Sequence, residues 1–247
     1  LGISHALLFA KELFTGKIIV AFADTLFKAE FKLDTNQDGI IWVQQVQDPS
    51  QFGVVRLNDQ NEIIEMVEKP STFVSDLAII GIYYFKDGAA LAAEMQYLID
   101  HDIKDKGEYQ FTSALQGLNK KGAKLVPGKV TEWLDCGNKS VTVQTNQRYL
   151  EFIKDQKLVS DQAKVKNSVI IPPCFVGAGA VIENSVIGPY VSVGEKTVIT
   201  DSRIKNSIIQ KDTKISGAIL ENSMLGNFVI FEGSWQDFSL GDFNSIT

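Results

Sequence analysis

A short phrase that recurs in the last third of the chain constrains the fold more than any other feature. Each copy has an Asn or Asp, then a Ser, then two residues of which the last is aliphatic. The copies are Asn167-Ser168-Val169-Ile170, Asn184-Ser185-Val186-Ile187, Asp201-Ser202-Arg203-Ile204, Asn206-Ser207-Ile208-Ile209 and Asn222-Ser223-Met224-Leu225. The first three begin at intervals of about 17 residues, and a fixed internal period is the signature of a stacked repeat.

Aliphatic residues recur about every five or six positions through the same region. They include Ile170, Val176, Ile182, Ile187, Val193, Ile199 and Ile204. Three such steps make one triangular coil whose aliphatic residues point inward, and one coil cannot bury its apolar face alone. The pattern resembles the hexapeptide repeats of left-handed parallel β-helices, and it predicts an all-β domain of about four coils over residues 156–247.

Composition narrows the range of partners. A chain of 247 residues with 45% apolar content suffices for one or two domains. The net charge of -6, without a cluster of Lys and Arg, argues against a nucleic-acid partner. Two cysteines, Cys136 and Cys174, make no disulfide framework, which favours a cytoplasmic protein. No apolar run approaches the roughly 18 residues of a membrane span, so no membrane partner is expected.

Roughly the first 150 residues alternate between helical and strand-like patterns. The expected helices cover residues 4–14, 88–100, 111–121 and 140–153, and the expected strands cover 17–23, 39–45, 53–57, 63–67, 79–85 and 124–126. Lys17–Ala23 is continuously apolar, which is typical of a strand buried in a parallel sheet. The alternation indicates a doubly wound α/β domain, which binds ligands at the carboxyl ends of its strands.

Two aspartates stand at positions suited to a metal ion. Asp24 follows the expected strand 17–23, and Asp135 lies in the segment Trp133-Leu134-Asp135-Cys136-Gly137, just before the last expected helix. Carboxylate oxygens suit Mg²⁺ beside a triphosphate, and two acidic groups from distant segments can bracket one ion. Each Asp also has a plainer interpretation, because an Asp before a turn or helix routinely acts as an N-cap.

Seven short motifs follow one another along the chain. They are Gly2-Ile3-Ser4-His5-Ala6, Phe22-Ala23-Asp24, Phe52-Gly53-Val54-Val55, Glu68-Lys69-Pro70, Gly81-Ile82-Tyr83, Gly107-Glu108-Tyr109-Gln110-Phe111-Thr112 and Trp133-Leu134-Asp135-Cys136-Gly137. Their order and spacing resemble the sugar-1-phosphate nucleotidyltransferases, with the glucose-1-phosphate thymidylyltransferases and their uridylyl relatives closest. The resemblance implies an α/β, Rossmann-like nucleotide-diphospho-sugar transferase domain over residues 1–155, ahead of the β-helix.

That family joins a nucleoside triphosphate to a sugar 1-phosphate and releases pyrophosphate, with Mg²⁺ as cofactor. The resemblance implies that Asp24 and Asp135 hold the Mg²⁺ and that Lys69 places a point charge on the sugar's phosphate. These three are the expected catalytic residues. The nearest resemblance favours dTTP or UTP as the nucleotide and glucose 1-phosphate as the sugar.

Four further residues match the family's binding segments. Gly2 and His5 fall where the family lines the base and ribose, although His5 is equally an ordinary residue of a first helical turn. Gly53 would let the sugar approach the backbone closely, and Glu68 would accept hydrogen bonds from sugar hydroxyls. Without the family, Gly53 is a turn glycine and Glu68-Lys69 is a solvated surface pair.

Gly81 and Tyr83 match the next sugar-facing segment of the family, while Tyr83 is equally suited to the core. Glu108 is the weakest candidate, because an acidic residue before a helix also satisfies first-turn preferences.

One element of the family has no counterpart in these residues. A glycine-rich loop that cradles the triphosphate with backbone N–H groups belongs upstream of the segment that begins at Gly2. The chain also starts at Leu1 without a methionine, so we expect an N-terminally incomplete domain of a longer protein. Such a piece would be inactive or nearly so, and its sheet would expose an unpaired edge unless another chain covers it.

Two other functions stay open. A non-catalytic regulatory or scaffold subunit would share this architecture; the absent loop favours it, and the retained carboxylates count against it. A hexapeptide-repeat acyltransferase usually needs a histidine base between its coils, whereas His5 and His101 lie far upstream of the repeats. The β-helix is then expected to serve stability, regulation or assembly of a homo-oligomer.

Overall fold

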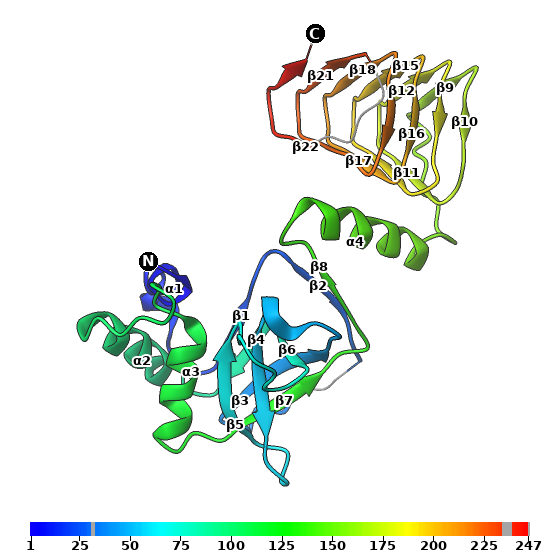
Figure 1. Cartoon of the computed structure of the whole chain (residues 1–247). Coiled ribbons are helices and arrows are strands. Elements are labelled where there is room, and N and C mark those ends of the chain that lie inside the picture. The colour runs from blue at the N-terminus through cyan, green and yellow to red at the C-terminus, as the bar shows by residue number, and fades with distance from the viewer. Residues whose placement is uncertain (31–32, 234–238, 247) are drawn as a thin grey trace. The chain divides into compact units, whose positions relative to one another are not determined.

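The structure is a computed structural model that describes residues 1–30, 33–233 and 239–246. The chain divides into two compact units, Leu1–Trp133 and Leu134–Thr247, which we call unit 1 and unit 2 (Figure 1). Each is described by itself. None of the described helices is long and apolar enough to cross a membrane.

Unit 1 is built on a mixed sheet in the order β5-β4-β6-β3-β7, with β1 also paired to β6. Its strands are β1 (Ile18–Ala21), β3 (Gly39–Gln45), β4 (Gly53–Leu57), β5 (Ile63–Glu68), β6 (Leu77–Phe85) and β7 (Leu125–Lys129). The expected α/β class is confirmed, but the doubly wound parallel sheet is wrong in detail. Among the described pairs of this sheet, β3 and β7 run parallel and the others antiparallel.

Three α-helices gather on one side of this sheet (Figure 1). They are α1 (Ile3–Leu8), α2 (Gly88–Asp100) and α3 (Phe111–Lys120). Asp87 caps α2, where its Oδ1 accepts a hydrogen bond from the Ala90 N–H at 3.0 Å. The single helix expected over residues 4–14 is wrong, because α1 ends at Leu8 and a 3₁₀ turn covers Lys11–Leu13. The core between helices and sheet holds large buried side chains such as Ile41, Phe85, Leu91, Met95 and Leu115.

Strand β1 differs from its expectation in burial. The apolar run predicts a strand covered on both faces, yet Ile19 is 59% exposed and Ala21 is exposed. Within the described residues β1 pairs with β6 alone, so it forms an edge of the sheet. An apolar edge strand with one neighbour leaves a row of backbone groups open to another strand.

Two short strands escaped the sequence analysis, β2 (Thr25–Lys28) and β8 (Glu132–Asp135). Because β2 follows Asp24 directly, the N-cap interpretation of Asp24 is wrong: no helix starts there.

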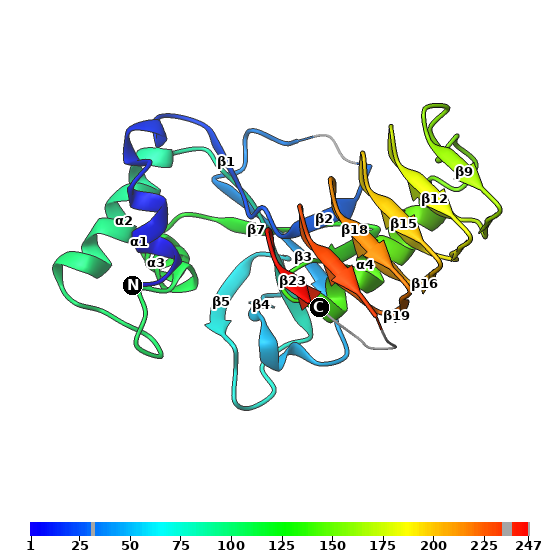
Figure 2. The same ribbon diagram turned by 90° about the horizontal axis from the view of Figure 1, so that it is seen from above.

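Unit 2 joins helix α4 (Lys139–Phe152) to a parallel β-helix. Three parallel sheets, one for each face of the coil, run β10-β13-β16-β19, β11-β14-β17-β20-β22 and β23-β21-β18-β15-β12-β9. The strands are β9 (Lys164–Lys166), β10 (Val169–Ile170), β11 (Cys174–Val176), β12 (Val181–Glu183), β13 (Val186–Ile187), β14 (Val191–Val193), β15 (Val198–Thr200), β16 (Arg203–Lys205), β17 (Ser207–Ile209), β18 (Lys214–Ser216), β19 (Ile219–Glu221), β20 (Met224–Leu225), β21 (Ile230–Glu232), β22 (Ser239–Leu240) and β23 (Ser245–Ile246). Figure 2 shows these coils stacked one behind another, which confirms the predicted solenoid.

The recurring phrase forms these coils because its Asn or Asp and its Ser have different structural roles. The Asn or Asp of each copy turns a corner in the left-handed region, as at Asn184 with φ of 50°, which Asn and Asp tolerate better than most residues. The Ser hydroxyl accepts the backbone N–H of the next coil: Ser185 Oγ from Ser202 at 3.0 Å, and Ser202 Oγ from Ala218 at 3.1 Å. Each coil is thereby hydrogen-bonded to its neighbour at a buried position that water does not reach.

Candidate functional site

The start of β4 and the end of β5 bring Gly53 and Glu68 together. The two residues are cross-strand partners in the antiparallel pair. A Cβ on Gly53 would lie 3.0 Å from Glu68 Oε2 and 3.1 Å from Thr112 Cγ2, so only glycine leaves this space open. Thr112, at the start of α3, donates from Oγ1 to Glu68 Oε2 at 3.4 Å. The carboxylate thus lies at the meeting point of β4, β5 and α3.

Burial raises the pKa of Glu68 above its ordinary value, and the nearby Lys69 charge, the Thr112 hydroxyl and Lys106 act against that rise. Tyr83 lies near enough that the Glu68 charge adds to the rise in the pKa of Tyr83, which burial dominates. The Tyr83 ring is buried and packs edge-on against Phe111 at 4.9 Å. Tyr83 is therefore a residue of the hydrophobic core in this structure.

A second lysine, Lys106, joins Lys69 at this point. Lys106 Nζ donates to the backbone carbonyl of Glu68 at 3.0 Å and also to that of Lys69. Lys69 itself has φ of 41°, an uncommon conformation for a residue other than glycine, and the Lys106 bonds hold this turn. Sequence reasoning missed Lys106. Its signal was its place directly before the Gly107-Glu108-Tyr109 motif.

Gly81 and Asp24 lie at the carboxyl end of β1. Gly81 has φ of 81°, and its carbonyl accepts the Phe22 N–H at 2.9 Å. Thr25 donates from Oγ1 to the Ile80 carbonyl at 2.8 Å, which fixes the turn that carries Asp24. Asp24 is exposed, and within the described residues its carboxylate makes no hydrogen bond or ion pair. Its oxygens are open to a ligand.

The segment that holds Gly2 and His5 is tied to the loop that carries Lys106. The Ser4 N–H donates to the Tyr109 carbonyl at 3.1 Å, and the Tyr109 N–H donates to the Leu1 carbonyl at 3.2 Å. Gly2 has φ of 84°, and a Cβ on this residue would lie 2.7 Å from the backbone carbonyl oxygen of Tyr109. The ring of His5 packs edge-on against Phe9 at 5.1 Å. The expected nucleotide-binding segment therefore contacts the same loop as the Glu68–Lys69 turn.

Asp135 belongs to unit 2 and ends β8. Its Oδ1 accepts the Gly137 N–H at 2.8 Å. The alternative that Asp135 caps the following helix is wrong, because Asn138 caps α4 by accepting from the N–H groups of Ser140 and Val141.

The donor chemistry of the two aspartates fits Mg²⁺. That ion prefers hard oxygen ligands and is usually held by one or two carboxylates, with water and substrate phosphates completing the shell. Among the residues that the structure describes, none is bonded to the Asp24 carboxylate, and Asp135 has one oxygen that accepts the Gly137 N–H. Among the described residues no group of three or more His, Cys, Asp or Glu forms a protein-only metal cage.

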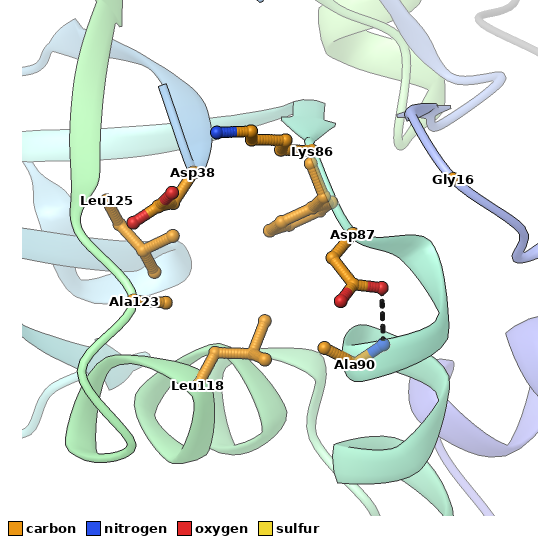
Figure 3. Close-up of a pocket in the computed structure, with 9 residues that line it drawn as sticks. Gly16, Asp38, Lys86, Asp87, Ala90, Leu118, Ala123 and Leu125 are labelled. Atoms are coloured by element: carbon orange, nitrogen blue, oxygen red, sulfur yellow. Dashed lines mark hydrogen bonds between the residues drawn. The ribbon is translucent and has the colours of Figure 1, made fainter. Parts of the chain in front are cut away.

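A cavity of about 490 Å³ lies at the carboxyl end of β6 (Figure 3). It is lined by Gly16, Asp38, Phe85, Lys86, Asp87, Ala90, Leu118, Ala123 and Leu125. None of the residues predicted for catalysis or binding lines it. The Asp87 carboxylate at its rim is engaged as the α2 cap (Figure 3).

Comparison with known proteins defines the class. Residues 4–151 match the family described as Nucleotidyl transferase, and residues 145–215 match the GlmU-like, C-terminal hexapeptide family. The first match covers more than half of the chain. The chain therefore belongs to the nucleotidyl transferase family, as its seven motifs predict.

The similar proteins include thymidylyltransferases and bifunctional GlmU proteins. A glucose-1-phosphate thymidylyltransferase of Streptomyces antibioticus is 30% identical over 258 residues, which covers 93% of this chain and 70% of that protein. Its counterpart in Streptomyces griseus is 28% identical, with the same coverage of both chains. A bifunctional protein GlmU of Methanocaldococcus jannaschii is 31% identical over 176 residues, covering 69% of this chain and 41% of that protein.

Proposed function

We propose that this chain carries the sugar-binding side of a sugar-1-phosphate nucleotidyltransferase, which joins dTTP or UTP to glucose 1-phosphate and releases pyrophosphate. The observation that carries the proposal is the cluster of Gly53, Glu68, Lys69 and Lys106 at one end of the sheet. It combines a space only glycine leaves open, a half-buried carboxylate and two cations. A phosphorylated sugar needs these three features: room at the backbone, an acceptor for hydroxyls, and positive charge for phosphate.

The roles of the residues follow from the chemistry. Glu68 accepts hydrogen bonds from sugar hydroxyls, while Lys69 and Lys106 offset the charge of the sugar phosphate as its oxygen approaches the α-phosphorus. Gly81 and Tyr83 shape the floor below the sugar, and Gly2 and His5 bound the nucleotide. Mg²⁺ held by Asp24 and Asp135 would neutralise charge on the phosphates. The residues contribute positioning and charge, and no covalent intermediate is required.

We infer that full activity needs a phosphate loop that this chain does not supply. The exposed apolar edge of β1 supports this inference, because a strand preceding such a loop would find a ready partner there. By itself the chain should bind the sugar phosphate and turn over little or nothing. We further propose a cytoplasmic homo-oligomer, with the β-helix as the assembling unit.

Binding of glucose 1-phosphate to the 247-residue chain tests the proposal by calorimetry. Glu68→Gln and Lys69→Met should each weaken binding about tenfold, since each removes a charged partner. Glu65→Gln is the matched control, because Glu65 lies on the same strand but pairs with Arg56 at the surface. Equal affinity in all four proteins would refute the sugar site.

Catalysis is tested in a longer protein that includes the phosphate loop. Mg²⁺-dependent pyrophosphate release, measured over four nucleoside triphosphates and several sugar 1-phosphates, should identify one preferred pair. Asp24→Asn and Asp135→Asn should each abolish that release. Turnover that survives either change would remove that residue from the metal site, and silence of the folded parent protein over the whole grid would favour a regulatory subunit.

A further inference from the structure

Glu94 of helix α2 is a buried carboxylate that the proposed reaction does not use. It is only 5% exposed. Its Oε1 accepts a hydrogen bond from Lys121, the residue that follows α3. A carboxylate removed from water is costly unless its oxygens are paired. Within the described residues Oε2 accepts no hydrogen bond, and it is not wholly shielded from solvent, so this oxygen is open to a ligand.

Gly117 makes room for that oxygen. It lies in the interior of α3, where glycine is among the least favourable residues. A Cβ at this position would lie 2.4 Å from Glu94 Oε2, so no other residue allows the carboxylate to stay where it is. A glycine inside a helix and a buried carboxylate are each unfavourable by themselves. Together, Gly117 and Glu94 hold Oε2 in one place.

A cavity of about 560 Å³ adjoins this oxygen in the groove between α2 and α3. Both Glu94 and Gly117 line it. Its apolar lining comes from Met66, Tyr97, Leu98 and Ile103, and its polar lining also includes Ser113, Gln116, Lys120 and Lys121. The volume is that of a small-molecule site, which is typically apolar with a few placed polar groups.

The charges around the cavity restrict its occupant. Lys120 has no ion-pair partner among the described residues, and Lys121 is shared between Glu94 and the ring of Tyr97. A ligand with only an anionic group would leave Glu94 Oε2 unpaired, and one with only an ammonium would meet two lysines. A ligand carrying both groups pairs each of them, while its side group covers the apolar lining.

We propose that this groove binds a small zwitterion of the α-amino-acid type with an apolar side group. Its ammonium donates to Glu94 Oε2, its carboxylate pairs with Lys120 and Lys121, and its side group packs on Met66, Leu98 and Ile103. Glu68 and Lys69 are not among the described residues that line the cavity, so its occupant would act as an effector rather than as a substrate.

Three matched probes test the proposal on the 247-residue chain by calorimetry and amide chemical shifts: L-phenylalanine, hydrocinnamate, which lacks the ammonium, and 2-phenylethylamine, which lacks the carboxylate. L-phenylalanine should bind saturably at one site, about tenfold or more tightly than either probe. The amides of Gly117 and Tyr97 should shift. No saturable binding by the folded chain, or equal binding of all three probes, would overturn the proposal.

Variants separate the site from a merely structural ion pair. Glu94→Gln and Lys120→Met should each weaken L-phenylalanine binding about tenfold, and Lys120 is exposed, so its variant should fold even where Glu94→Gln does not. Glu62→Gln is the control, because it removes an ion pair with Lys124 outside the cavity. Binding that survives Lys120→Met, or that falls equally in Glu62→Gln, contradicts the assignment.

Discussion

Replacing Gly81 by Ala tests the packing beneath the candidate site. Two glycines of unit 1, Gly81 and Gly107, share a φ of 81°, but their surroundings differ. A Cβ on Gly81 would lie 2.9 to 3.2 Å from atoms of Phe22, whereas a Cβ on Gly107 would meet nothing within 4 Å. Both substitutions therefore strain the backbone, and only one also crowds a ring.

The magnitudes follow from these two terms. Left-handed backbone costs a residue other than glycine about 1–2 kcal/mol, and overpacking costs about 1–3 kcal/mol more. Gly107→Ala should then lower the free energy of unfolding by about 1–2 kcal/mol and Gly81→Ala by about 2–5 kcal/mol. The difference between the two losses in unfolding free energy measures the contact between β6 and Phe22, which lies two residues before Asp24.

Equilibrium unfolding in urea measures both variants, with the fluorescence of Trp42 and Trp133 reporting on unit 1. Unchanged denaturant slopes would show that stability alone has changed. If both variants lose the same free energy, the Phe22 contact adds nothing, and the inference that Gly81 is needed to make room for Phe22 fails.

Three further predictions concern single hydrogen bonds or charges. Because burial raises the pKa of Glu68, the folded state favours its protonated form; its contribution to stability is present at low pH and is lost as pH rises through the raised pKa. Glu68→Gln should remove the part of the fall in unfolding free energy that Glu68 contributes as pH rises above the ordinary pKa of a glutamate, and an unchanged pH dependence of that free energy would contradict this. Ser202→Ala should cost about 1–3 kcal/mol, because the buried Ala218 N–H loses its acceptor; thermal unfolding measures this, and a neutral result would discount the serine contacts. Asn138→Ala should cost about 1 kcal/mol and speed hydrogen exchange of the Ser140 and Val141 amides, unless another group caps α4.

Prediction from sequence succeeded where structure is decided locally. The bounds of β3, β4 and α2 agree with the expected ranges 39–45, 53–57 and 88–100. In each case the period of the apolar residues and a nearby turn or cap residue point to the same element. The coils of unit 2 were predictable for a related reason, since each copy of the phrase supplies both its corner and its contact with the next coil.

Prediction failed where a neighbour distant in sequence decides. The apolar run of β1 indicates a preference for burial, but whether Ile19 is covered depends on which strands lie beside it. Lys106 escaped notice because its partners, the carbonyls of Glu68 and Lys69, lie 38 and 37 residues away and carry no side-chain signature. Residues predicted by motif are brought together only in part: Gly53 and Glu68 meet directly, while the joint role of Asp24 and Asp135 stays a prediction.

The serine contacts of unit 2 give the solenoid an adjustable length. They connect residues 17 positions apart in the first coils and 16 positions apart in the later ones. The hydroxyls of Ser168, Ser185, Ser202 and Ser207 each accept an N–H from the following coil and donate to a carbonyl two residues earlier in their own coil, whatever the total number of coils. Gain or loss of one whole coil would leave all remaining contacts intact, whereas insertion of a single residue within a strand would reverse which side chains face the core. Natural variation in the length of this β-helix should therefore come in steps of one coil. Duplication of one coil should lengthen the β-helix without disturbing the others.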